Sequence, residues 1–210
     1  MRRLVLATRN PSKHREIAAI YAHLPLTLLS LADYPEIVDL PEEGATYAEN
    51  AVAKARPVAA ATGLVALADD SGIEIAALDG APGIHSARFL GGGATDAERN
   101  ARVLALLHSI PVRRRTAWYR AVIAVALPDG AVRVFEGACA GAIAEAARGT
   151  GGFGYDPIFV PEGEAVTMAE ISPDTKNRIS HRARALRAAE PFLLRIFGLA
   201  VQDRVDARGK

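Results

Sequence analysis

Two adjacent aspartates follow a short apolar run in the first third of the chain. Asp69 and Asp70 come after residues 64–68 and before Ser71 and Gly72, which favour a turn. Neighbouring residues of a strand point to opposite faces, but a turn at this place would let both carboxylates reach one site. One carboxylate could then bind Mg²⁺ while the other binds metal or positions a water. An Asp-rich turn without a ligand is the alternative interpretation.

A polar segment, residues 8–13, stands between an apolar run and a helical pattern. Backbone N–H groups at the start of a helix attract anions, and Lys13 adds a full positive charge there. The segment is not a P-loop, because it has no G-x-x-x-x-G-K-[ST] run, and an ordinary capped turn is the alternative. The candidate phosphate-binding residues of this segment are Thr8, Arg9, Asn10, Pro11, Ser12 and Lys13.

A glycine-rich segment, residues 149–157, matches the pattern G-x-G-x-x-G. A dinucleotide-binding interpretation fails, because a proline and an extended-looking run follow the glycines where a helix should begin. Phe153 and Tyr155 could instead stack on a nucleobase, while open backbone groups around Gly154 and Asp156 bind its edge. A tight structural turn is the alternative.

A basic segment lies at the start of the last predicted helix. Arg182 can donate parallel hydrogen bonds to a phosphate or a carbonyl group, and His181 can donate or accept. Lys176 precedes them by a few residues. Capping of the helix by Ser180, with surface charge around it, is the alternative.

Charge is segregated along the chain, although the net charge is only +1. Residues 33–79 contain ten acidic and two basic residues, whereas residues 176–210 contain nine basic and three acidic residues. In the acidic segment Glu42 could supply a further metal-binding oxygen, with Glu43 as the second choice and Lys54 nearby. A cleft with carboxylates on one wall and cations on the other would suit a magnesium–nucleotide complex. Two solvated surfaces are the alternative.

The elements that must position these residues alternate between strands and helices. Apolar runs predict strands at residues 4–7, 26–31 and 64–68, with 73–78 continuing extended. A turn at residues 128–130 predicts a hairpin of residues 117–127 and 131–136. The expected helices are residues 12–22 with Ser12 as N-cap, 46–61 with a break expected at Pro57, 95–107, and 180–197 with a break expected near Pro191. This order predicts an α/β fold with a mixed sheet flanked by helices.

Composition excludes several classes of protein. With 210 residues, 50% of them hydrophobic and 23% charged, the chain is typical of a soluble globular protein rather than a disordered one. The longest apolar run, residues 121–127, is far shorter than the roughly 20 residues of a membrane span, and the N-terminus does not resemble a signal peptide. A single cysteine, Cys139, cannot form an internal disulfide and favours the cytoplasm.

Taken together, these segments closely resemble the inosine triphosphate pyrophosphatase family, and its bacterial branch fits best. The resemblance spans residues 4 to about 190 in collinear order. The runs that carry it are residues 6–10 with Lys13 and Glu16, residues 49–51 with 54–55, residues 68–72, residues 80–83, residues 86–88, residues 151–159 and residues 180–182. One departure is Arg9, where many bacterial relatives have glycine; Arg9 could contact phosphate or point to solvent.

The resemblance implies one catalytic domain over residues 1–198, with two lobes around a central active-site cleft, and a tail at residues 199–210. It implies a cytoplasmic homodimer without membrane association or stable nucleic-acid binding. The implied reaction is Mg²⁺-dependent hydrolysis of the α–β phosphoanhydride of ITP, dITP or XTP to a nucleoside monophosphate and pyrophosphate, which cleanses the nucleotide pool. A Maf-like pyrophosphatase acting on pyrimidine or modified nucleotides is the alternative.

The resemblance also implies roles by position. Asp70 would be the general base, with Asp69 beside it at the metal and Glu42 as the third metal carboxylate. Lys13 and Lys54 would lie near the phosphates, with residues 8–13 around the triphosphate. The remaining substrate contacts would come from Ser71, Phe153, Gly154, Tyr155, Asp156, Lys176, His181 and Arg182.

Overall fold

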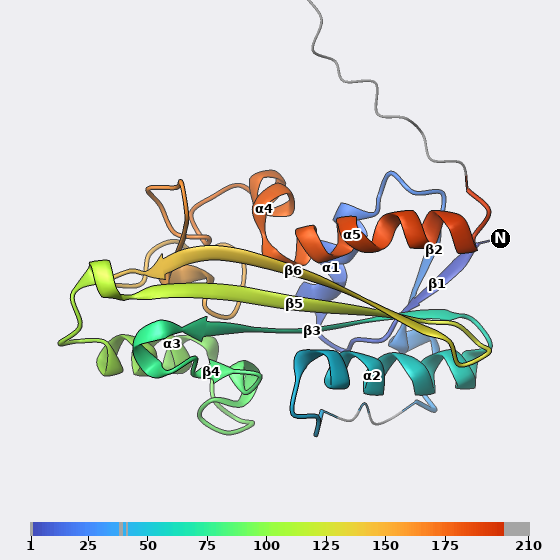
Figure 1. Cartoon of the computed structure of the whole chain (residues 1–210), viewed down its shortest axis with the longest axis horizontal. Helices are drawn as coiled ribbons and strands as arrows, with labels where there is room; N and C mark the ends of the chain where they lie inside the picture. Colours follow the sequence, from blue (N-terminus) through green and yellow to red (C-terminus); the bar gives the residue numbers. More distant parts are fainter. Residues whose placement is uncertain (1, 38–39, 41, 200–210) are drawn as a thin grey trace, which may run out of the picture.

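The computed structural model describes residues 2–37, 40 and 42–199, and its elements surround one sheet (Figure 1). The strands are β1 (Arg3–Leu6), β2 (Thr27–Ser30), β3 (Val65–Ile75), β4 (Pro82–Gly83), β5 (Thr116–Ala126), β6 (Val132–Ile143) and β7 (Phe159–Pro161). The α-helices are α1 (Pro11–Ile20), α2 (Tyr47–Thr62), α3 (Asp96–Leu106), α4 (Pro173–Ile179) and α5 (His181–Ile196). No helix within these ranges is both long and apolar enough to cross a bilayer. The expected C-terminal tail lies, from residue 200 on, outside the described residues.

The sheet has seven strands, with the order β2-β1-β3-β5-β6-β7 and with β4 paired to β3. β1 runs parallel to β2 and β3, whereas β3, β5, β6 and β7 form antiparallel pairs. The long strands β3, β5 and β6 therefore form the spine of the molecule. These pairings confirm the expected α/β fold with a mixed sheet.

Helices cover both faces of the sheet at the end that holds β1. Figure 1 shows α5 on one side of the long strands and α2 on the other. Alternation along β1 explains the arrangement, because successive side chains point to opposite faces. Leu4 and Leu6 are buried in the core beneath α1 and α5, whereas Val5 and Ala7 are buried beneath α2.

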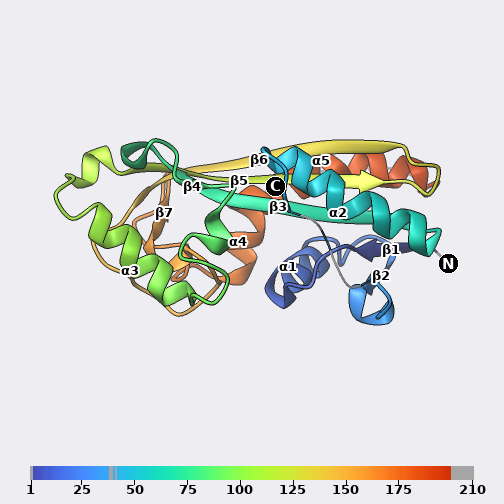
Figure 2. The ribbon, with the colours of Figure 1, turned by 90° about the horizontal axis from the view of Figure 1, so that it is seen from below.

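A second lobe lies at the other end of the long strands. Figure 2 shows α3 and β7 at that end, away from β1 and β2. A separate buried cluster holds this lobe together, and it includes Val103 and Leu107 of α3, Ile73 of β3 and Phe159 of β7. The structure therefore has the two expected lobes, joined by the long strands.

The expected turn at Asp69 and Asp70 is wrong. β3 continues from Val65 to Ile75, and Asp69 and Asp70 pair with Ile123 and Val122 of β5. Gly72 serves a close approach instead of a turn, since a Cβ atom there would lie 2.2 Å from the carbonyl oxygen of Gly83. In an unbroken strand the two carboxylates must point to opposite faces of the sheet.

The four expected helices begin and end close to the expected residues, with two differences, whereas α4 was not expected. Asn10 rather than Ser12 caps α1, because its side chain accepts hydrogen bonds from the N–H groups of Ser12 and Lys13. The breaks expected at Pro57 and Pro191 are absent, since α2 and α5 continue through them. Packing of each helix against the long strands outweighs the hydrogen bond that each proline removes.

Candidate active site

The site lies where one edge of β3 has no neighbouring strand. Among the described strands, β1 pairs with this edge as far as Leu67, and β4 pairs with it from Ile73 on. The residues between them, 68–72, include both aspartates, and their backbone groups on this edge are open to side chains. The carboxyl end of β1 points at the same gap, which is the place where open α/β sheets bind ligands.

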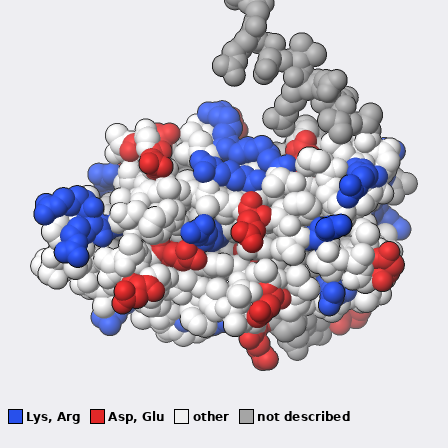
Figure 3. Space-filling model, viewed as in Figure 1, with Lys and Arg blue, Asp and Glu red and all other residues white. Residues whose placement is uncertain are grey.

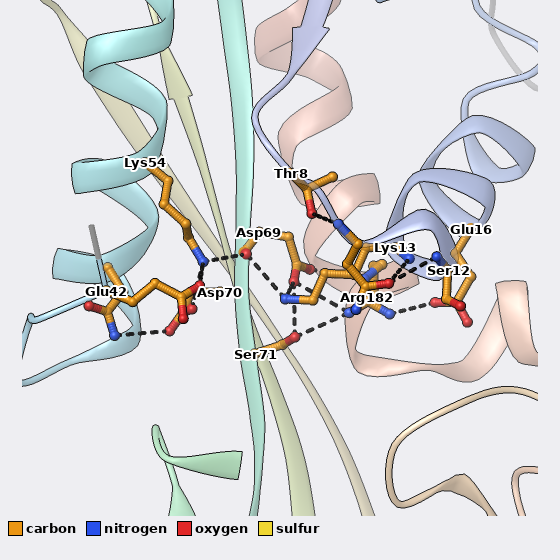
Figure 4. Close-up of polar contacts among 12 residues, drawn as sticks. Thr8, Ser12, Lys13, Glu16, Glu42, Lys54, Asp69, Asp70, Ser71 and Arg182 are labelled. Carbon is orange, nitrogen blue, oxygen red and sulfur yellow. Dashed lines mark hydrogen bonds and ion pairs between the residues drawn. The ribbon is translucent and has the colours of Figure 1, made fainter. Parts of the chain in front are cut away.

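On the α2 side of β3, Lys54 joins two carboxylates (Figure 4). Its Nζ atom lies 2.7 Å from Asp70 Oδ1 and 2.8 Å from Glu42 Oε1. Asn50 Nδ2 donates to Asp70 Oδ2 at 3.3 Å. Burial opposes the charge on Lys54, but Asp70 and Glu42 outweigh it and raise the pKa of the ammonium group. Burial raises the pKa of Asp70, and Lys54 offsets this only in part.

On the opposite face of β3, Asp69 is held in a buried ion-pair network. Arg182 Nε donates to Asp69 Oδ2 at 2.9 Å, and Lys13 Nζ lies 2.5 Å from Oδ1. Ser71 Oγ also donates to Oδ1, at 2.9 Å. Burial opposes ionisation, but Arg182 and Lys13 outweigh it and hold the pKa of Asp69 well below its usual range. Asp69 is therefore a stably ionised carboxylate.

The two lysines meet at one backbone atom. Lys13 Nζ and Lys54 Nζ donate to the carbonyl oxygen of Asp69 at 3.2 and 3.0 Å. They approach from opposite faces of the sheet, because the carbonyl lies on the free edge of β3 (Figure 4). Burial, with repulsion from Lys54 and Arg182, lowers the pKa of Lys13 in spite of Asp69. The edge therefore carries two converging cations, which is the arrangement that phosphate binding requires.

The expected metal site of three carboxylates is not formed. In the described part of the chain, no group of three or more His, Cys, Asp or Glu side chains is placed to hold a metal ion. Glu42 and Asp70 share Lys54, whereas Asp69 lies on the other face with Lys13 and Arg182. This separation contradicts the shared site expected for the two aspartates, and its cause is the uninterrupted strand.

Glu42 and Asp70 nevertheless fit a bound Mg²⁺. Magnesium takes oxygen ligands, keeps several waters, and is commonly held by one or two carboxylates together with substrate phosphates. Lys54 already brings the two carboxylates together, and the Glu42 side chain is 40% exposed, so that its oxygens are open to solvent. Of the two candidates in this loop, Glu42 makes the contacts, and Glu43 is exposed.

The segment 8–13 divides between two hollows. Arg9 turns away from the main cleft and donates to the carbonyl of Ile37. The Thr8 side chain binds its own loop, since its Oγ1 atom accepts from the N–H of Asn10 at 3.2 Å. The residues that line the main cleft are Asn10, Ser12 and Lys13, and those that line a separate hollow are Thr8, Arg9 and Pro11, with Asn10 reaching both.

The main cleft, of about 210 Å³, extends from this segment to the glycine-rich segment. On its wall the Phe153 ring has Lys176 Nζ at 4.9 Å and Arg182 Cζ at 5.3 Å from the ring centroid. Asp156 fixes this wall by accepting hydrogen bonds from the N–H of Phe153 and from Lys176. Sites that enclose a whole ligand measure roughly 300–1,000 Å³, so the cleft suits part of a nucleotide, such as its base. The expected residues that line it are Ser71, Phe153, Gly154, Tyr155, Asp156, Lys176, His181 and Arg182.

His181 presents a neutral ring inside this cleft. The ring stacks on Tyr119, with centroids 4.4 Å apart and planes 4° apart. Burial, with repulsion from Arg182, holds the pKa of His181 well below its usual value. Its Nδ1 atom is buried and has no hydrogen-bond partner among the described residues. A buried polar atom without a partner is uncommon in a folded protein, and this one belongs to a residue that lines the cleft.

The basic residues of the described C-terminal segment, 176–199, divide between the outer surface and the site. Figure 3 shows Lys and Arg side chains gathered near α4 and α5 on the outside of the molecule, and Arg178 and Arg184 are exposed. Lys176 and Arg182 are buried and face the cleft. The segregated charge is therefore partly a solvated surface and partly one wall of the site.

Sequence reasoning missed several residues that line or support the cleft. Glu16 belongs to a run noted above but was assigned no role; its Oε1 lies 2.7 Å from Lys176 Nζ and its Oε2 lies 2.5 Å from Arg182 Nη1. Tyr119 lies in a strand that was predicted, but nothing local marks it as part of a site. The other lining residues that were missed are Gly72, Ser86, Ala87, Asp96 and Arg99.

The chain matches one family of known proteins over most of its length. The Ham1 family model matches residues 4–192. A dITP/XTP pyrophosphatase of Geobacter sulfurreducens is 52% identical over 193 residues, covering 92% of this chain and 97% of the relative. One of Thermus thermophilus is 51% identical over 187 residues and covers 89% of each chain. Among solved structures, a HAM1 protein from Coxiella burnetii superposes with a TM-score of 0.84 at 42% identity, covering 93% of this chain and 100% of that one. The chain belongs to the Ham1 family.

Proposed function

We propose that the protein is a nucleoside triphosphate pyrophosphatase that hydrolyses the α–β phosphoanhydride of dITP, ITP and XTP. The observation that carries the proposal is the continuity of one cleft from the Phe153 wall to Lys13, beside the β3 edge where Lys13 and Lys54 meet. Similar proteins named dITP/XTP pyrophosphatases support the substrate class. Hydrolysis of such nucleotides would remove deaminated purines from the nucleotide pool.

Asp70 is the proposed general base. Its raised pKa makes it a better proton acceptor than an ordinary carboxylate, and Lys54 and Asn50 fix its orientation. It would accept a proton from the attacking water. Mg²⁺ held by Glu42 and Asp70 would neutralise charge on the triphosphate.

Lys13 and Lys54 are the proposed cations for the departing pyrophosphate. Both ammonium groups are fixed by the Asp69 carbonyl before any substrate binds. Donors that are already in place stabilise developing charge without reorganisation. Asp69 and Arg182 would hold Lys13 in this position rather than take part in proton transfer.

Selectivity would arise in the cleft between Phe153 and His181. Hypoxanthine and xanthine carry an oxygen at purine position 6, where adenine carries an amino group. The cleft wall carries the donors Lys176 and Arg182, with the His181 ring beside them. A donor that faces the adenine amino group remains unpaired, and such a mismatch can discriminate by several powers of ten.

The test is a comparison of kcat/KM for dITP, ITP, XTP, GTP, dATP and dTTP with Mg²⁺. The proposal expects the first three to be hydrolysed at least about a hundredfold faster than dATP and dTTP. Preference for dTTP would indicate the Maf-like alternative. Equal rates for all six would refute selective recognition of the base.

We also propose that the enzyme acts in the cytoplasm as a homodimer, with residues 1–198 as its catalytic unit. The proposal extends the resemblance described above. The proposed substrates are free nucleotides of the cellular pool. Light scattering during size-exclusion chromatography measures the mass directly. A single species of 22.2 kDa would contradict the dimer.

A further inference from the structure

Helix α3 forms hydrogen bonds with both backbone polar groups of Gly154, in the glycine-rich segment. The N–H of Gly154 donates to Asp96 Oδ2 at 2.6 Å. Its carbonyl oxygen accepts from Asn100 Nδ2 at 3.0 Å. Asp96 and Asn100 lie one turn apart on α3, so their side chains fall on the same face of the helix. A single helix face therefore fixes one peptide unit on each side of this glycine.

Gly154 stands between the two aromatic residues of the proposed base pocket. Phe153 and Tyr155 flank it, and both line the cleft. Its φ angle of +66° belongs to the left-handed region, which favours glycine and sets the directions of its neighbours. A shift of the Gly154 backbone would therefore move the Phe153 ring relative to Lys176 and Arg182.

The burial of Asn100 argues against a role in stability alone. The residue is 4% exposed, and its Oδ1 atom has no hydrogen-bond partner within the described residues. A buried acceptor without a partner destabilises a fold relative to an aliphatic side chain of similar size. The hydrogen bond from Nδ2 to Gly154 is thus the contact that distinguishes asparagine from leucine at this position.

We propose that Asp96 and Asn100 are positioning residues that set base selectivity by holding Gly154, and this inference rests on the proposed function. They act through Phe153 and Tyr155. The lysines proposed to bind phosphate lie on α1 and α2, in the other lobe, and within the described residues their hydrogen bonds and ion pairs go to Asp69, Asp70 and Glu42 rather than to α3. Loss of the hydrogen bonds from α3 to Gly154 should therefore weaken recognition of the base and leave binding of the triphosphate unchanged.

The test measures kcat/KM for dITP and for dATP with Asn100→Leu and Asp96→Asn. Asn100→Leu removes the donor at nearly constant volume, and Asp96→Asn replaces the charged acceptor of the Gly154 N–H by a neutral one, which weakens that hydrogen bond. Each variant should lower the ratio of kcat/KM for dITP to that for dATP at least about fivefold, which corresponds to the free energy of about one hydrogen bond. In Asn100→Leu the removal of the unpartnered Oδ1 atom offsets the loss of the hydrogen bond to Gly154, so Tm should stay close to that of the wild type while the ratio falls.

Val103→Ala is the matched control. Val103 is fully buried on the same helix and packs in the core of this lobe without bonding to Gly154. It should lower Tm and keep the dITP-to-dATP ratio within about twofold of the wild type. An unchanged ratio in Asn100→Leu and Asp96→Asn would overturn the inference, as would an equal fall in Val103→Ala. A wild-type enzyme without preference for dITP would instead refute the proposed function.

Discussion

The two neighbouring aspartates of β3 should respond differently to the same substitution. Asp69→Asn removes the charge that compensates Arg182 and Lys13 in a network where the side chains of Asp69 and Arg182 are 0% and 1% exposed. Asp70→Asn removes a carboxyl group whose pKa is raised. A lowered pKa means that the fold favours the ionised form, and a raised pKa means that it favours the neutral form. Neutralisation should therefore destabilise the fold at Asp69 and not at Asp70.

The structure sets the size of the loss at Asp69. Removing one partner of a buried ion pair costs about 3–5 kcal/mol of unfolding free energy. Arg182 would retain Glu16 at 2.5 Å, and the Lys13 side chain is 15% exposed. We therefore expect the lower end of that range, about 3 kcal/mol, for Asp69→Asn. In a protein of this size that loss lowers Tm by about 6–12 °C.

Asp70→Asn should change the unfolding free energy by less than about 1 kcal/mol, since Lys54 would keep Glu42 at 2.8 Å as its partner. Urea unfolding at pH 7, followed by circular dichroism, measures both variants against the wild type. The m-values should stay equal, so that the midpoints report stability alone. Equal losses in the two variants, or a larger loss in Asp70→Asn, would refute the assignment of Asp69 to structure and Asp70 to chemistry.

Three further predictions concern turnover, substrate binding and pH. Asp70→Asn should lower kcat for dITP by about 10²–10⁴-fold, the usual contribution of a general base; turnover within a few-fold of the wild type would remove Asp70 from that role. Lys13→Ala should mainly raise KM for dITP, and an unchanged kcat/KM would show that residues 8–13 are only a helix cap. His181 is buried and neutral, because burial and Arg182 lower its pKa. The unfolded chain therefore binds a proton there below pH 6.5 that the folded chain does not, and at pH 5.5 this lowers the unfolding free energy by up to about 1.4 kcal/mol. Urea unfolding at pH 7 and 5.5 measures this fall in unfolding free energy. The fall should be smaller in His181→Gln than in the wild type, and an identical fall in both would contradict the buried neutral ring.

Local patterns predicted the elements of the fold well, because each depends on residues close in sequence. The hairpin across residues 128–130 and the α2 stop at Gly63, which has a φ angle of +63°, follow from turn and cap chemistry alone. The turn at Asp69 and Asp70 was wrong because pairing with β5 overrides the local preference of Asp and Gly. Ten residue pairs hold β3 to β5, and no signal within residues 64–78 reports that partner.

In the candidate site, too, features carried by local runs were predicted, and features that depend on distant residues were not. Residue types and order identified Lys13, Lys54, Asp70 and the Phe153 segment, since each belongs to a recognisable local run. Tyr119 was not predicted, because its part in the cleft depends on stacking with His181, 62 positions away in the chain by their numbers. The hydrogen bonds from Asn100 and Asp96 to Gly154 likewise join residues that are 54 and 58 positions apart, respectively. Such contacts follow from the packing of the two lobes rather than from any motif.

The most direct test of the account is the identity of the products formed from dITP and Mg²⁺. Ion-exchange chromatography separates dIMP from dIDP, and an enzymatic assay separates pyrophosphate from orthophosphate. The account predicts dIMP and pyrophosphate in equal amounts from the first turnover, with both formed about 10²–10⁴-fold more slowly by Asp70→Asn. Formation of dIDP and orthophosphate would contradict cleavage of the α–β bond and with it the proposed function.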